Sequence, residues 1–394
     1  MKFSDHDSGL RRGRRKKARF MVSIARKNLF RDKLRFVIAL VGIQFAVVLI
    51  TIQAGVFLRF LVNASVLIDH AHADIWITAR NLSNFEFGRA YSDKVYYQTQ
   101  KVNGVAWAEK YILTFSLWKR PSGGQESVEL VGFDPETMNG APWRVIEGNI
   151  YDVKYLDQVM VDEADLARLG NPRVGDYIEI RGKKARIIGL TRGAKSFTQT
   201  PFVFTSFENT IRLSFLNRGQ TVYVLVKVSP GYTVSDVQRR LQEVLPDNDV
   251  YTRQQFSNKS RRYWMVSTGA GLALLASALM GLVIGTIIVG QTIYASTIEH
   301  IKEFGTLKAI GASNADIYLI IIKQALINSV IGFSTGMIIA QGVIRLMRQG
   351  GLDVLMPWQM MTGIFAVTVM MCISSSFISI FKITRIDPAL VFKS

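Results

Sequence analysis

The sequence predicts an α-helical membrane protein with four transmembrane helices, one followed by three, and a large α+β extracytoplasmic domain between the first and second helices. Two observations lead to this fold class. Four apolar runs are long enough to span a bilayer, and the first is separated from the second by a long mixed segment without a span. The spans are expected at residues 36–58, 263–298, 317–344 and 356–381, and the periplasmic domain at 59–262.

The charge distribution favours a membrane protein over a nucleic-acid binder. The 394 residues carry a formal net charge of +18, and 49% of them are hydrophobic. Residues 1–35 hold 13 Lys or Arg and three Asp, directly before the first apolar run. Such a segment is typical of a cytoplasmic anchor that faces anionic headgroups. We therefore expect a basic, amphipathic N-terminal segment on the cytoplasmic side.

The length of the apolar runs sets how each crosses the membrane. Residues 36–58 are uncharged and would extend about 35 Å as a helix, enough for a hydrocarbon core of about 30 Å. Residues 263–298 are also uncharged and would extend about 54 Å, so the surplus is expected to project outward as a helical stalk. A short outer loop at 345–355 and a cytoplasmic tail at 382–394 complete the layout.

Small residues inside the spans predict close helix packing. Two GxxxG motifs occur, one in the second span and one in the third. They are formed by Gly281, Gly285, Gly332 and Gly336. No carboxylate or basic residue lies at the centre of a span, which argues against an ion channel or a proton-coupled carrier.

The segment between the first two spans reads as an α+β domain. Short apolar or alternating stretches are separated by Gly and Pro. Strands are expected at 73–78, 111–119, 127–133, 158–161, 176–180, 185–190 and 222–228. Helices are expected at 91–100, 163–169, 207–216 and 233–244. The turn Arg181-Gly182-Lys183 predicts a hairpin between two of these strands.

The chain shows no motif for a cofactor, a metal or an enzymatic reaction. Its one cysteine, Cys372, excludes an intramolecular disulfide, and its four histidines form no HExxH motif. Residues 189–196, GLTRGAKS, lack the adjacent Gly-Lys pair of a phosphate-binding loop. We expect no catalytic residue and no bound cofactor.

A charged, glycine-punctuated segment at 299–316 separates the second and third spans. Its apolar residues, such as Phe304 and Leu307, recur at helical spacing, while Glu303 and Lys308 would face water or a partner. Gly311 predicts the end of this helix, and Ser313 the N-cap of the next.

Residues 303–313, EFGTLKAIGAS, resemble the signature of FtsX/MacB-type ABC transporter permeases. In that family the segment forms a coupling helix that docks on a cytoplasmic ATPase. The resemblance implies these ATPase-coupling residues: Glu299, Glu303, Phe304, Gly305, Leu307, Lys308, Ala309, Gly311, Ala312 and Ser313.

Other segments support the same family. IARKNLFRDKLR at 24–35 and TRIDPALVFK at 384–393 resemble its lead-in and closing motifs, and GDYIEIRGKKARIIGL at 175–190 resembles a hairpin of MacB-like periplasmic domains. The first span and the following HADIWI at 72–77 resemble the DevC-type exporter permeases of cyanobacteria.

The resemblance implies a homodimeric exporter permease of the inner membrane, with both termini cytoplasmic. ATP would be bound by a separate ATPase subunit, and a membrane-fusion adaptor and an outer-membrane duct would complete the complex. The cargo would be a lipid, glycolipid, peptide or drug. Two alternatives remain open: an FtsX-like signalling protein that activates an extracytoplasmic hydrolase, and a LolC/LolE-like permease that extracts lipoproteins.

Overall fold

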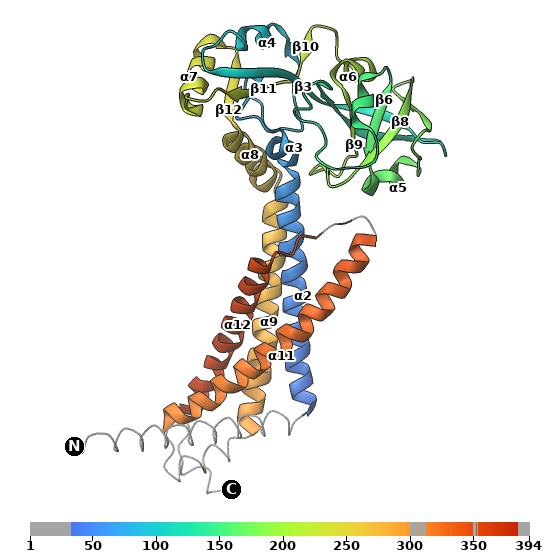
Figure 1. The fold of residues 1–394 in the computed structure, drawn as a ribbon. Helices are drawn as coiled ribbons and strands as arrows, with labels where there is room; N and C mark the ends of the chain where they lie inside the picture. Colours follow the sequence, from blue (N-terminus) through green and yellow to red (C-terminus); the bar gives the residue numbers. More distant parts are fainter. Residues whose placement is uncertain (1–32, 300–305, 307–312, 350–351, 353, 385–394) are drawn as a thin grey trace, which may run out of the picture. The chain divides into compact units, whose positions relative to one another are not determined.

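The computed structural model describes residues 33–299, 306, 313–349, 352 and 354–384 (Figure 1). The chain divides into two compact units. One comprises Met1–Leu58 with Ala273–Ser394, and the other comprises Arg59–Leu272. The predictions for residues 1–32, for most of the 299–316 segment and for 385–394 lie outside the described residues.

The first unit contains helices that are long and apolar enough to cross a membrane, which confirms the prediction of four spans. The candidate spans are Phe36–Asn63, Ala270–Ala295, Asn314–Gln349 and Trp358–Ser376. They belong to α2 (Lys33–Asn63), α9 (Ala270–Glu299), α11 (Asn314–Gln349) and α12 (Trp358–Thr384). The helix α11 continues through Arg345 and Arg348, so the outer loop expected to begin at 345 is shorter than predicted. The guanidinium of Arg348 donates to the backbone oxygen of Val354, 3.2 Å away, and bridges that loop.

The prediction of one continuous helix over residues 263–298 is wrong. In the structure α8 (Arg253–Arg262) leads into a π-helical turn at Tyr263–Ser267, and α9 begins only at Ala270. Gly269 between them has a φ of +73°, which a right-handed helix does not allow. The uncharged sequence therefore contains a membrane helix and a separate turn, and α9 alone has the length a bilayer needs.

The second unit is the predicted α+β domain, and its first lobe is a helix-covered sheet. The strand order is β12-β1-β11-β3, all antiparallel. The strands are β1 (Ile75–Ala79), β3 (Val105–Lys119), β11 (Tyr223–Val228) and β12 (Asn248–Thr252). The helices α4 (Lys94–Thr99) and α7 (Val234–Val244) cover one face, where Val95, Val237 and Leu241 pack against alternate strand residues. The short strands β2 (Tyr91–Ser92) and β10 (Gln220–Thr221) pair separately.

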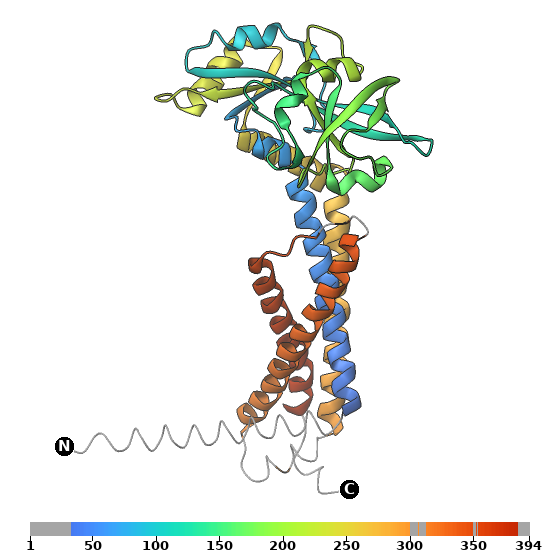
Figure 2. The same ribbon diagram turned by 45° about the vertical axis from the view of Figure 1, so that its right-hand side comes forward.

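The second lobe is a closed ring of strands (Figure 2). The order around the ring is β3-β4-β9-β6-β8-β7, and β7 returns to pair with β3. The new strands are β4 (Gln125–Phe133), β6 (Gln158–Asp162), β7 (Tyr177–Ile180), β8 (Lys183–Thr191) and β9 (Phe202–Ser206), with β5 (Val145–Gly148) beside β8. Closure leaves no free edge in the ring, and apolar side chains such as Trp118 and Val161 fill its interior.

Short helices connect and flank the two lobes. They are α3 (Val66–His70), η1 (Ile150–Lys154), η2 (Glu163–Asp165), α5 (Leu166–Leu169) and α6 (Phe207–Leu213). The long strand β3 joins the lobes, because its first half pairs with β11 and its second half pairs with β4.

The predicted strands all occur, with ends that differ by a few residues, and the predicted hairpin is confirmed. Ile180 pairs with Lys183, and Arg181 and Gly182 between them both have positive φ, as a tight two-residue hairpin turn requires. The helix expected at 91–100 begins only at Lys94, because residues 91–92 pair as β2. The strands β5, β9 and β12 and the helices α3 and α8 were not predicted.

Candidate functional site

The described part of the coupling segment consists of its two ends and Thr306. Glu299 is the last residue of α9 and is exposed. Ser313 caps α11, since its Oγ accepts from the backbone N–H of Asp316 at 3.3 Å and donates to the carboxylate of Asp316 at 2.8 Å. This arrangement confirms Ser313 as the predicted N-cap. The coupling segment thus connects α9 to α11. The remaining predicted coupling residues lie outside the described residues: Glu303, Phe304, Gly305, Leu307, Lys308, Ala309, Gly311 and Ala312.

The glycines of both GxxxG motifs lie against the first span. A Cβ on Gly281 would come within 2.4 Å of the side chain of Leu49, and a Cβ on Gly332 within 2.5 Å of Ile43. Gly285 faces Ala46, and Gly336 faces Val47. Each motif therefore lets one helix approach α2 of the same chain closely.

Two polar contacts reinforce this packing inside the bundle. The side-chain amide of Gln44 in α2 donates to the hydroxyl of Thr335 in α11, at 2.8 Å. The hydroxyl of Ser375 in α12 donates to the backbone oxygen of Thr286 in α9, at 2.9 Å. Such bonds in an apolar bundle fix which faces of the helices meet.

In the second unit, a polar cluster joins the helices at the two points where the chain enters and leaves the domain. We call residues 59–70 and 253–267 the foot of the domain. The carboxylate of Asp69 accepts from Ser65 at 2.8 Å, from Ser257 at 2.6 Å and from the guanidinium of Arg261 at 2.7 Å. The hydroxyl of Ser260 donates to the backbone oxygen of Ala64 at 2.6 Å. These bonds hold α3 and α8 together. No local sequence pattern indicates these bonds, because Asp69 and Arg261 are far apart in the chain.

An aromatic stack adds to the foot. The ring of Phe197 lies parallel to the indole of Trp264, with centroids 4.1 Å apart, and 5.1 Å from the ring of Phe60. Phe197 belongs to the loop between β8 and β9, so this loop of the second lobe contacts both segments of the foot.

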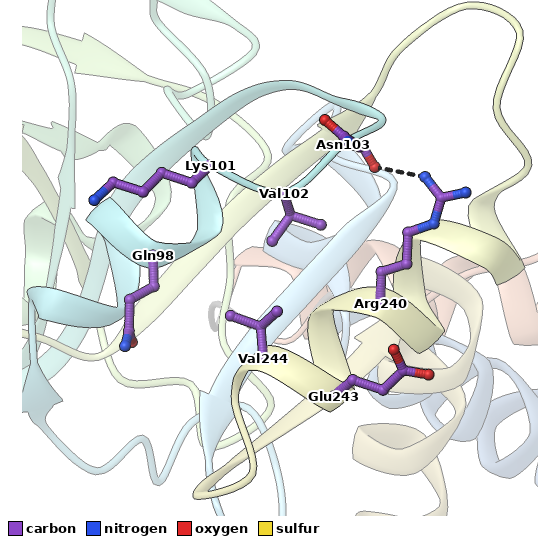
Figure 3. Close-up of a pocket in the computed structure, with 7 residues that line it drawn as sticks. All are labelled: Gln98, Lys101, Val102, Asn103, Arg240, Glu243 and Val244. Carbon is purple, nitrogen blue, oxygen red and sulfur yellow. Dashed lines mark hydrogen bonds between the residues drawn. The ribbon is translucent and has the colours of Figure 1, made fainter.

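The surface of the domain carries open hollows, and two of them are lined by charged side chains. The hollow in Figure 3 has a volume of about 410 Å³ and lies between α4 and α7. The guanidinium of Arg240 donates there to the backbone oxygen of Asn103, at 3.0 Å. Its lining residues are Gln98, Lys101, Val102, Asn103, Arg240, Glu243 and Val244.

A second hollow of about 250 Å³ is lined in part by Glu109, whose side chain is buried. Burial raises the pKa of Glu109, while hydrogen bonds from Thr137 and Asn139 oppose the rise. Across the described ranges, no group of three or more His, Cys, Asp or Glu lies close enough to hold a metal ion.

Comparison with protein families agrees with this architecture. The model described as the MacB-like periplasmic core domain matches residues 36–244, which is more than half of the chain. The chain belongs to the MacB-like periplasmic core domain family. A second model, described as FtsX-like permease C-terminal, matches residues 263–388 of this MacB-like chain, the part that contains α9, α11 and α12. The predicted resemblance to FtsX/MacB-type permeases is confirmed.

Individual relatives are distant. An uncharacterised ABC transporter permease of Methanocaldococcus jannaschii is 22% identical over 229 residues, 55% of this chain and 56% of that protein. The macrolide export ATP-binding/permease protein MacB of Agrobacterium fabrum is 26% identical over 232 residues, 55% of this chain and 35% of that protein. The matched region thus spans about half or less of these relatives. The crystal structure of the periplasmic region of MacB from Actinobacillus actinomycetemcomitans aligns with a TM-score of 0.37 and 13% identity, covering 48% of this chain and 92% of that one.

Proposed function

We propose that this chain is the permease subunit of an ABC transporter of the MacB and FtsX type, and that it couples ATP hydrolysis on a separate ATPase subunit to export. Two family matches support this proposal, one over the outer domain and one over the last three membrane helices. The observation that carries it is the coupling signature at 303–313, which lies between the end of α9 and the N-cap of α11.

The proposed mechanism is mechanical. Two ATPase subunits close beneath the coupling segments of a permease dimer and displace the ends of α9 and α11. The contacts of Gly281 and Gly332 with α2 make the bundle stiff enough to move as packed helices. Because α2 (Lys33–Asn63) runs without a break into the first residues of the foot, we propose that a displacement of α2 is passed to the hydrogen bonds of Asp69.

The proposed orientation places the N-terminus, the coupling segment and the C-terminal tail in the cytoplasm of a cell with this chain in its inner membrane. The basic residues 1–35 support it by the positive-inside rule. A membrane-fusion adaptor and an outer-membrane duct are the proposed further partners, and an amphiphile such as a lipid, glycolipid, peptide or drug is the proposed cargo. The spans have no central charge that would favour an ionic cargo.

The decisive experiment measures ATP turnover of the purified ATPase with and without this chain in lipid nanodiscs. We expect Gly311→Pro, and separately the Glu303→Lys/Lys308→Glu exchange, to abolish the stimulation of turnover by the chain while the protein still inserts. A matched control reverses an exposed ion pair of the outer domain, Lys119→Glu/Glu179→Lys, whose charged atoms lie 2.8 Å apart.

Stimulation that survives both coupling-segment changes would show that this segment is not the coupling element. The choice between export and the two alternatives depends on the partner. Turnover that responds to an adaptor supports export, whereas an ATPase complex that ignores adaptors and captures a cell-wall hydrolase or a lipoprotein contradicts it.

A further inference from the structure

Two carboxyl side chains are buried together where the second lobe meets the loop between β8 and β9. Glu129 lies on β4 and is 0% exposed, and Glu86 lies in the loop after β1 and is 2% exposed. Val128 and Leu130 on either side of Glu129 point into the ring, so Glu129 points outward from it, under the covering loop. Carboxyl groups are rarely buried to this degree without a cation as a partner.

The covering loop supplies the hydrogen bonds of both groups. The backbone N–H of Phe197 donates to one oxygen of Glu86 at 2.7 Å. The hydroxyls of Ser196 and Thr198 bond the carboxyl of Glu129, and the two hydroxyl oxygens lie 3.0 Å apart. The second carboxyl oxygen of Glu86 and that of Glu129 have no hydrogen-bond partner among the described residues.

These surroundings favour the protonated forms. Burial raises the pKa of Glu86 to about 7, against the lowering effect of the Phe197 N–H. Burial and the charge of Glu86 raise the pKa of Glu129 well above its ordinary value. The phenols of Tyr223, Tyr91 and Tyr111 also interact across this region, and burial raises the pKa of all three, so they stay neutral. Two carboxylates at such a site cannot both be charged without a large cost.

The same loop is bound to the foot of the domain. Phe197 stacks on Trp264 and contacts Phe60, and the side-chain amide of Asn63 donates to the backbone oxygen of Ser196 at 3.5 Å. If this loop moved away from the carboxyl pair, it would also lose its contacts with both segments of the foot.

We propose that the buried pair Glu86 and Glu129 is a proton-operated latch: protonated, it holds the loop 194–200 on the foot of the domain, and ionised, it releases that loop. The proposal is independent of ATP coupling. The closed state binds protons more tightly than the open state, in which a carboxyl regains its ordinary pKa of 4.5. The closed state is therefore favoured at low pH, and its advantage falls as the pH rises from about 4.5 through about 7.

Amide hydrogen exchange of the full chain in lipid nanodiscs, followed from pH 5 to pH 8.5, tests the latch. After correction for the intrinsic pH dependence of exchange, protection of the amides at 196–199 is expected to fall about tenfold per pH unit for each proton released. The hairpin β7–β8 serves as the internal reference, and its corrected protection is expected to stay constant.

Variants assign the effect to the pair. Glu86→Gln/Glu129→Gln keeps the shape and removes both charges, so protection of 196–199 is expected to become independent of pH. Glu147→Gln removes an exposed carboxyl of β5, and protection of 196–199 in this variant is expected to depend on pH as it does in the unaltered chain. If the double variant does not fold, the single variant Glu86→Gln is expected to show a shallower profile between pH 4.5 and 7 than the unaltered chain.

If protection of the amides at 196–199 in the unaltered chain does not change with pH, the proposal is overturned without any variant. An unchanged pH dependence in the double variant would overturn it too, because the titrating group would then lie elsewhere.

Discussion

Replacement of Asp69 should weaken the foot of the outer domain by an amount that its contacts define. Asp69→Ala removes three hydrogen bonds to one carboxylate, from Ser65, Ser257 and Arg261. A hydrogen bond to a charged group contributes roughly 1.5–3 kcal/mol when buried. The ion pair with Arg261 is screened, because the two side chains are 34% and 31% exposed. We therefore expect a total loss of about 2–3 kcal/mol rather than the full sum.

Thermal unfolding of the full chain in detergent, followed by tryptophan fluorescence, measures this loss. Trp264 lies within the foot and Trp76 within the core, so both report on the domain. For a domain of this size, a loss of about 2–3 kcal/mol lowers the Tm by about 4–12 °C. Asp69→Asn keeps one acceptor oxygen and should cost less than Asp69→Ala.

The control is Arg262→Ala, which removes an exposed neighbour of the same charge as Arg261. The reasoning is refuted if Asp69→Ala lowers the Tm no more than this control does. It is also refuted if Asp69→Ala and Arg261→Ala add within about 0.5 kcal/mol in the double variant, because residues in contact should not behave independently.

Three further changes test other parts of the structure. Gly332→Leu should destabilise the membrane bundle by about 1–3 kcal/mol or more, because it overpacks the contact with α2. Gly342→Leu in the same helix has open space and should leave the stability of the bundle unchanged. The temperature of heat-induced aggregation in detergent measures both effects. Burial, and then the charge of Asp162, raises the pKa of Asp165 to about 6, so ionisation of Asp165 disfavours the folded state as the pH rises from 3.8 through 6. Asp165→Asn should therefore stabilise the domain by about 1–3 kcal/mol at pH 7.5 but not at pH 4. The Tm of the variant and of the unaltered chain at the two pH values measures this difference. Trp118→Phe should cost about 2–3 kcal/mol in denaturant unfolding, because it leaves a gap in the ring and removes the 3.2 Å hydrogen bond from the indole to the backbone oxygen of Leu169; an unchanged midpoint would contradict this.

The structure also shows why some elements escaped prediction. The strand β12 has the sequence NDVYT, whose polar residues are typical of a loop, yet it pairs with β1 along its whole length. The helix α8 is charged and polar along most of its length, and no helix was predicted for these residues of the outer domain. Both elements are fixed by partners distant in the chain, which local patterns do not report.

The sequence by itself determined the four apolar helices, the family and the main strands of the outer domain. Long uncharged runs, alternating strands and a local signature are all properties of neighbouring residues, so they can be read without knowledge of the fold. The tertiary structure alone decided the closed ring of strands, the break before α9, the hydrogen bonds of Asp69 in the foot and the carboxyl pair Glu86 and Glu129. Each of these depends on chain segments that meet only after folding. Burial in particular changes the chemistry of a carboxyl group, and no sequence pattern distinguishes Glu129 from an exposed glutamate on a strand.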